Sequence, residues 1–200
     1  VQALWINAPH AGAAWSARWA DLERRAQAAF RTRFPDPATG GLRDVVDPDD
    51  SSVRPNQIFA VGGLPLQLLD PAQARAVVDL VESRLLTPLG LRTLEPGAPC
   101  YVPHYGGSPA ERDAAYHQGT VWPWLTGPFV EAWLRVRAHA EAARAEARAR
   151  FLPPLLAHLD TAGLGHVSEL ADADPPHRPG GCPFQAWSLG ELIRIEAMLE

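Results

Sequence analysis

The stretch Tyr116-His117-Gln118-Gly119-Thr120-Val121-Trp122-Pro123-Trp124 marks the passage from a long irregular segment to an apolar helix. On its N-terminal side, residues 87–116 are rich in Gly, Pro, Tyr and His and show no helical periodicity. On its C-terminal side, residues 120–137 follow an apolar helical pattern. An irregular segment of this length inside a domain is usually functional or disordered, and its aromatic content favours order.

Helical patterns cover most of the preceding chain. A first surface helix of about 20 residues is predicted by apolar side chains that recur every three or four positions on one face, namely Trp15, Trp19, Leu22, Ala26 and Phe30. A second helix is expected over residues 55–69, although the Gly62-Gly63 pair disfavours helix there. Asp70-Pro71 is typical of the cap and first turn of a third helix, over residues 71–86.

The C-terminal part continues the same architecture. Residues 140–162 form an Ala, Arg and Glu stretch that Pro153 and Pro154 should kink or split, and a last helix is expected over 185–199. A second irregular segment, Gly163 to Pro183, separates them. Six helices joined by two long connections favour an all-α toroid over a bundle, because bundles have short turns. Any strands are expected as a hairpin inside the loops, and the length favours one domain, residues 1–200.

Composition and charge exclude several classes of function. A net charge of -5 without a basic run argues against nucleic acid and anionic membrane as partners, and no apolar stretch approaches a transmembrane span. Cys100 and Cys182 are too few for a disulfide framework, although one bridge between them stays open. A reduced, cytoplasmic location is therefore expected. The N-terminus, from Val1 to Trp5, has neither the charged region of a signal peptide nor an initiator Met.

Metal and cofactor sites are not expected either. Potential ligands are scattered through the loops, at Cys100, His104, His117, His166, His177 and Cys182. Structural zinc sites use close ligand pairs, and this sequence has no Cys-x-x-Cys or His-x-x-x-His pair among them. It also lacks a phosphate-binding glycine loop and a nucleophile elbow.

The opening stretch has the composition of a sugar site. It combines Tyr116, Trp122 and Trp124 with the hydrogen-bonding side chains of His117, Gln118 and Thr120. A pyranose stacks its C–H faces on aromatic rings while its hydroxyl groups need fixed donors and acceptors. The alternative is that Trp122 and Trp124 belong to the core and that His117 is a buried, satisfied imidazole.

Arg54-Pro55-Asn56-Gln57 lies where a loop enters a predicted helix, so its polar side chains would project from a helix N-terminus. Such an arrangement can aim hydrogen bonds at sugar hydroxyl groups. The alternative is a capping and loop-tethering role for Arg54 and Asn56.

Carboxylates that could act in catalysis lie in the second irregular segment. Glu169 follows Gly165-His166-Val167-Ser168, and Asp172 and Asp174 come shortly after. An inverting glycosidase needs one carboxylate to deprotonate water and a separate carboxylic acid to protonate the leaving oxygen. Any of the three residues could be the first of these, and a solvated loop carboxylate is the ordinary alternative.

Taken in order, several blocks of the chain resemble the amylo-α-1,6-glucosidase domain of glycogen-debranching enzymes. The resemblance covers essentially the whole chain, and its most distinctive block is the stretch from Tyr116 to Trp124. The matching blocks are Arg54-Pro55-Asn56-Gln57, the segment 86–94, Tyr105-Gly106-Gly107-Ser108-Pro109, the segment 116–124, His166-Val167-Ser168-Glu169 and Gln185-Ala186-Trp187-Ser188.

The resemblance implies an (α/α)6 barrel that removes, with inversion and without a metal, the α-1,6-linked glucose left at a trimmed branch of glycogen or limit dextrin. It implies that Glu169 is the general base. The residues expected to bind the branched α-glucan are Arg54, Asn56, Gln57, Tyr116, His117, Gln118, Trp122, Trp124, Gln185 and Trp187.

The chain departs from the family pattern at its start. The family's general acid is an Asp in a Trp-Met-Asp motif shortly upstream of a segment that resembles residues 1–7, and this sequence contains no such motif. The C-terminal half or so of the barrel is therefore expected, with the acid supplied by a preceding segment or another chain. A non-catalytic α-glucan-binding remnant and an (α/α)6 glycosidase acting on trehalose or a related glucoside are the alternative interpretations.

Overall fold

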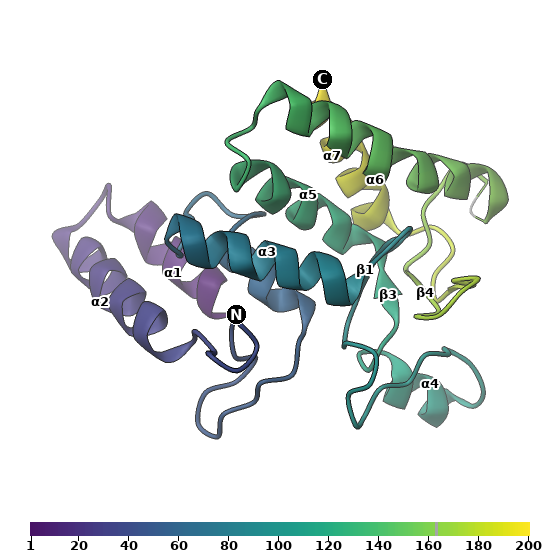
Figure 1. Ribbon diagram of the computed structural model, residues 1–200, viewed down its shortest axis with the longest axis horizontal. Coiled ribbons are helices and arrows are strands. Elements are labelled where there is room, and N and C mark those ends of the chain that lie inside the picture. Colours follow the sequence, from purple (N-terminus) through teal and green to yellow (C-terminus); the bar gives the residue numbers. More distant parts are fainter. Residues whose placement is uncertain (163) are drawn as a thin grey trace.

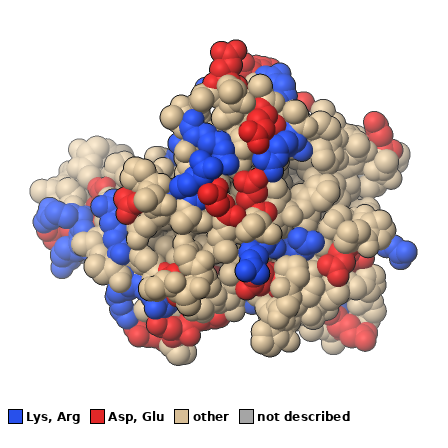
Figure 2. All heavy atoms as spheres, in the orientation of Figure 1, with Lys and Arg blue, Asp and Glu red and all other residues tan. Residues whose placement is uncertain are grey.

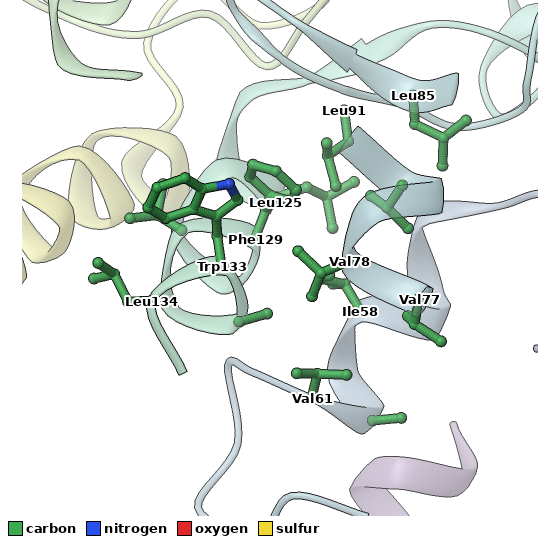
Figure 3. Close-up of a cluster of buried hydrophobic side chains, with 14 of the residues drawn as sticks. Ile58, Val61, Val77, Val78, Leu85, Leu91, Leu125, Phe129, Trp133 and Leu134 are labelled. Atoms are coloured by element: carbon green, nitrogen blue, oxygen red, sulfur yellow. The ribbon is translucent and has the colours of Figure 1, made fainter. Parts of the chain in front are cut away.

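Apolar residues of the segment 120–137 build the centre of the hydrophobic core. Helix α5 (Thr126–Arg135) is buried along most of its length, and the rings of Phe129 and Trp133 are fully buried. They cluster with Val78 of α3 (Pro71–Leu85) and Ile58 of the 3-10 helix η1 (Pro55–Ala60) (Figure 3). Burial of each such side chain contributes about 1.5–3 kcal/mol to folding. The computed structural model describes residues 1–162 and 164–200.

Two further helices enclose α5. These are α6 (Glu141–Thr161) and α7 (Ala186–Leu199), which pack against α5 and against each other (Figure 1). Phe151 of α6 meets the rings of Phe129 and Trp133 edge-on, with centroid distances of 5.6 Å in both pairs. The predicted helix over 185–199 is therefore confirmed, and it encloses the core from the C-terminal end of the chain.

A polar seam joins α3 to α6 at the edge of this core. Glu82 accepts a hydrogen bond from Nε1 of Trp133 at 2.9 Å and one from Arg150 at 2.5 Å. The Arg137 guanidinium lies 3.6 Å from the centre of the Trp133 ring. Because the Glu82 side chain is only 21% exposed, these partners are needed to offset its desolvation. On the face shown in Figure 2, basic and acidic side chains are also interspersed.

Helices α1 (Gln2–Gly12) and α2 (Ala17–Arg33) pack against each other at the opposite edge of the fold (Figure 1). The sequence reading did not predict α1. It did predict α2, which begins at the Ser16 cap, so that Trp15 lies outside the helix. Of the predicted apolar face only Phe30 is buried, and Trp15 and Trp19 are 84% and 41% exposed. Leu22 and Ala26 are half-buried, so the predicted apolar face is partly covered, and α2 packs mainly against α1.

Short strands within the loops form one antiparallel sheet. In the described residues it has five strands in the order β1 to β5: β1 (Leu86–Thr87), β2 (Gly90–Arg92), β3 (Val121–Trp122), β4 (Leu170–Ala171) and β5 (Pro179–Gly180). β1 and β2 form the expected hairpin, in which Leu86 lies opposite Leu91. Since β3 also pairs with β2 and with β4, the described chain is about half helical with a small sheet, and not purely helical.

Several predicted boundaries need correction. The helix expected over 55–69 ends at Ala60, and the one expected over 120–137 is divided into β3, the 3-10 helix η2 (Pro123–Leu125) and α5. Residues 109–115, which showed no helical periodicity, form α4 (Pro109–Ala115) behind a capping box of Ser108 and Glu111.

The other predicted helices have different outcomes. α3 is confirmed with its Asp70 cap, whose carboxylate accepts a hydrogen bond from the Gln73 amide. The predicted split at Pro153 and Pro154 does not occur, because α6 runs through both. Buried neighbours such as Phe151 outweigh the intrinsic preference of proline there. The second irregular segment was predicted to begin at Gly163, which lies outside the described residues. None of the described helices has the length and apolar character needed to cross a bilayer.

The Gly62-Gly63 pair explains why η1 stops early. A Cβ atom on Gly62 would lie 2.4 Å from the Ala132 amide nitrogen and 2.7 Å from the Pro128 carbonyl oxygen of α5. Gly63 has a φ of 75°, in the left-handed region that favours glycine. After Ala60 the chain thus leaves the helical path and runs close against the backbone of α5. A side chain at position 62 would have no space there.

We therefore predict that Gly62→Ala destabilises the fold by about 1–3 kcal/mol, because the added methyl group must displace the α5 backbone. Gly190→Ala is the control, since nothing lies within 4 Å of an added Cβ at that α7 position. It should stabilise by about 0.5–1 kcal/mol. Urea unfolding measures both, and equal effects of the two changes would contradict the close approach.

Candidate functional site

An aromatic pocket of about 460 Å³ lies where η1, β3 and the start of α7 meet. Its volume falls within the range of small-molecule sites, about 300–1,000 Å³. Seven of the ten residues predicted to bind substrate line it. The complete lining is Arg54, Pro55, Asn56, Thr93, Tyr116, His117, Trp122, Trp124, Leu125 and Trp187.

Aromatic rings follow one another along the pocket wall. His117 stacks on Trp122 at 5.4 Å, and Trp124 stacks on Trp187 at 5.3 Å. Trp187 also meets Trp122 edge-on at 5.8 Å. Trp122 is only 4% exposed and belongs to the core cluster, whereas Trp187 is 48% exposed. The wall is thus anchored in the core at one end and offers a free ring face for stacking at the other.

Arg54 fixes the loop that carries this wall. Its guanidinium donates to the carbonyl oxygens of Thr93 at 3.1 Å and His117 at 2.8 Å, and to Oε1 of Gln118 at 3.0 Å. Its Nε lies 3.6 Å from a carboxylate oxygen of Asp44. The contacts show the loop-tethering role that was considered for Arg54, and they place its side chain in the pocket wall as well.

The three predicted glutamines lie outside the pocket lining. Both polar groups of the Gln57 side chain meet backbone groups, the Leu42 amide at 3.1 Å and the Arg54 carbonyl at 3.0 Å. The Gln118 side chain accepts the bond from Arg54, and the backbone N–H of Gln185 donates to the Val167 carbonyl at 3.0 Å. These residues hold the loops together beside the pocket.

Glu169 is attached to the pocket through Tyr116. The Tyr116 hydroxyl donates a hydrogen bond to Oε1 of Glu169, and the Cys182 amide donates to Oε2 at 2.8 Å. Burial raises the pKa of the Tyr116 phenol, and the bond to Glu169 raises it further. The phenol therefore remains a protonated donor. Glu169 does not itself line the pocket, and it lies just before β4, whose pairing with β3 brings it to this position.

The two competing carboxylates have different surroundings. Asp172 is 9% exposed, and its oxygens accept bonds from His104 Nδ1 and the Tyr105 amide, both at 2.8 Å. Asp174 accepts a bond from the Tyr101 hydroxyl at 2.7 Å. Burial, followed by this bond, raises the pKa of Tyr101 to about 12. Among the described residues, neither carboxylate accepts a hydrogen bond from a residue that lines the aromatic pocket.

Sequence reasoning missed two contributors to the site. His158 of α6 places its Nε2 2.9 Å from Ser168 Oγ, directly beside Glu169, and burial lowers the pKa of this imidazole. Tyr105 packs against Tyr116 with a centroid distance of 5.9 Å. His158 has no spacing that links it to Glu169 along the chain, whereas Tyr105 begins one of the blocks that resemble the family, a signal that could have placed it at the site.

The loop ligands do not form a metal centre in the part of the chain that the structure describes, where no cluster of three His, Cys, Asp or Glu side chains occurs. Both Cys100 and Cys182 are exposed free thiols, so the bridge left open between them is not formed.

The family model for amylo-alpha-1,6-glucosidase matches residues 1–194. The chain belongs to this family. It is also 28% identical to the glycogen debranching enzyme of Saccharomyces cerevisiae over 166 residues, which is 74% of this chain and 11% of the yeast enzyme. This family member thus spans a small part of the length of that relative.

The fold of this family member is similar to the folds of several solved enzyme structures. It is similar to a GH63 mannosylglycerate hydrolase from Thermus thermophilus in complex with glucose, with a TM-score of 0.59 and 18% identity over 90% of this chain and 40% of that one. The neutral trehalase Nth1 from Saccharomyces cerevisiae gives a TM-score of 0.58 and 17% identity over 90% of this chain and 30% of that one. The likeness shows the fold alone, that of part of an (α/α)6-barrel enzyme.

The Arg54 contacts generate a prediction for the pocket wall. Arg54→Lys replaces a planar fork by a single ammonium, which cannot reach three acceptors at once. We expect a loss of about 1–3 kcal/mol in stability and faster amide hydrogen exchange in residues 116–120. Arg84→Lys is the control, because Arg84 is 59% exposed and lies 3.6 Å from its only ion-pair partner in the described chain, Glu95. Unchanged exchange in 116–120 after Arg54→Lys would contradict the tethering role.

Proposed function

We propose that this chain forms part of a debranching glucosidase site that hydrolyses α-1,6-linked glucose at trimmed branch points of glycogen or limit dextrin. Membership of the amylo-alpha-1,6-glucosidase family supports the class of reaction. The observation that carries the proposal is the Tyr116 hydrogen bond, which joins a carboxylate to a sugar-sized aromatic pocket. A glucosyl ring would stack on the Trp187 and Trp124 faces, and Asn56 would bind its hydroxyl groups.

Glu169 is the proposed general base. Two donors, the Tyr116 hydroxyl and the Cys182 amide, hold its carboxylate in one orientation. The remaining lone pairs of that carboxylate can accept a proton from water. The water oxygen then bonds to the anomeric carbon as the bond to the glycosidic oxygen breaks. An acid on the opposite side gives that oxygen a proton, so the released glucose has the inverted configuration.

The proposed acid comes from outside these 200 residues. An inverting site needs a second carboxyl group about 6.5–9.5 Å from the first, and this sequence contains no Trp-Met-Asp motif to provide the family's acid. The same observation favours the second candidate, a non-catalytic α-glucan-binding module. Turnover by a polypeptide that adds the acid distinguishes the two functions.

We predict that Glu169→Gln lowers kcat by roughly 10²-fold or more with little change in KM, because the amide keeps the volume but cannot accept the proton. The assay is glucose release from a branched limit dextrin by a polypeptide in which a segment with the Trp-Met-Asp motif precedes this chain. The 200-residue chain alone should release no appreciable glucose, since losing one partner of an acid and base pair costs orders of magnitude.

Asp172→Asn and Asp174→Asn are matched controls, since each makes the same change within five residues of Glu169. Both should affect kcat less than Glu169→Gln does. Near-normal turnover by Glu169→Gln together with inactivity of either control would reassign the base. Robust turnover by the 200-residue chain would show that the acid lies within it.

A further inference from the structure

His158 is a buried imidazole that the proposed reaction does not use. It lies on α6, is 5% exposed, and does not line the aromatic pocket. The backbone N–H of Ser168 donates to its Nε2 at 3.3 Å, and Ser168 Oγ lies 2.9 Å from the same nitrogen. Because Ser168 is itself only 2% exposed, water has little access to these two groups, and both depend on His158 for a hydrogen bond.

The backbone bond decides which ring nitrogen of His158 carries the proton. A backbone N–H can only donate, so Nε2 must offer its lone pair, and the proton of the neutral ring lies on Nδ1. The Ser168 hydroxyl then donates to the same lone pair. A proton on Nε2 would set two N–H groups against each other, so the contact requires a neutral imidazole. Burial lowers the pKa of His158 and thereby favours this neutral form.

The segment 167–169 ends at the proposed base, Glu169. Its first carbonyl accepts a bond from the Gln185 N–H at 3.0 Å, and its last N–H donates to the Cys182 carbonyl at 2.9 Å. Between these two main-chain contacts, the His158 side chain holds the middle residue. Of the three contacts, only the one to His158 is made by a side chain, so it is the contact that a substitution can remove.

We propose that neutral His158 is a positioning residue, which fixes the backbone of the segment 167–169 and thereby directs the Glu169 carboxylate. The inference rests on the proposed function, in which that carboxylate accepts a proton from water. A small displacement of such a group slows the reaction, because the reacting atoms must be aligned. The sugar is held elsewhere, in the aromatic pocket, so loss of His158 acts on kcat and leaves KM almost unchanged.

The first test is nitrogen NMR of the imidazole rings in the unchanged 200-residue chain at neutral pH, which distinguishes a bare ring nitrogen from a protonated one. His158 should carry its proton on Nδ1 and have a bare Nε2. A proton on Nε2, in a neutral or a charged ring, would overturn the proposal, because the Ser168 N–H could not then donate to that atom.

Two variants separate the hydrogen bond from packing. His158→Leu fills a similar volume but has no acceptor, whereas the side-chain oxygen introduced by His158→Gln can accept in place of Nε2. In the 200-residue chain, the Ser168 amide should exchange about tenfold or more faster in His158→Leu and at nearly the original rate in His158→Gln. In the polypeptide that adds the Trp-Met-Asp segment, kcat should fall about tenfold or more in His158→Leu, with little change in KM, and stay nearly normal in His158→Gln.

Phe151→Leu is the control for general destabilisation, because Phe151 lies on the same helix and packs in the core against Phe129 and Trp133. It should lower stability and leave kcat unchanged.

A normal kcat in His158→Leu would overturn the proposal, and so would equal losses in His158→Leu and His158→Gln. If the unchanged extended polypeptide releases no glucose, the proposed function fails. The anchor is then decided by exchange: a Ser168 amide that exchanges faster only in His158→Leu supports it, and equal rates in all three chains overturn it.

Discussion

The guanidinium of Arg54 is the contact on which the rest of the site depends. It ties the start of η1 to the Thr93 carbonyl and to the loop at His117, while its Nε faces Asp44. A planar group with several donors can meet acceptors from separate loops, which a single point charge cannot. The aromatic pocket uses this side chain as a wall, and so does an adjoining cavity of about 300 Å³.

The small sheet supplies the second constraint. Pairing of β3 with β4 sets Val121 opposite Ala171, and this register brings Glu169 to the hydroxyl of Tyr116. Residues 53 positions apart in the sequence are thereby joined by a single hydrogen bond. The helices provide the buried platform, with Trp133 at its centre, and the chemistry lies in the loops that the sheet holds.

The features that could be predicted from the sequence are those that depend on residues close together along the chain. The Asp70 cap and the apolar spacing of α3 identified that helix, and the mixture of polar and aromatic side chains from Tyr116 to Trp124 identified the pocket wall. Tertiary contacts decided the rest. Gly62 ends η1 because the α5 backbone lies against it, and the strands of the sheet are too short to carry a periodic pattern.

The most direct test of the account is a crystal structure of the chain with bound glucose. We predict a glucosyl ring stacked on Trp187 or Trp124 within the aromatic pocket, with the Glu169 carboxylate still held by Tyr116 and directed toward a water molecule near the anomeric carbon. A ring bound elsewhere on the surface, or a Glu169 side chain that turns away from Tyr116 when the pocket is filled, would contradict the central claim that this pocket and this carboxylate form one glucosidase site.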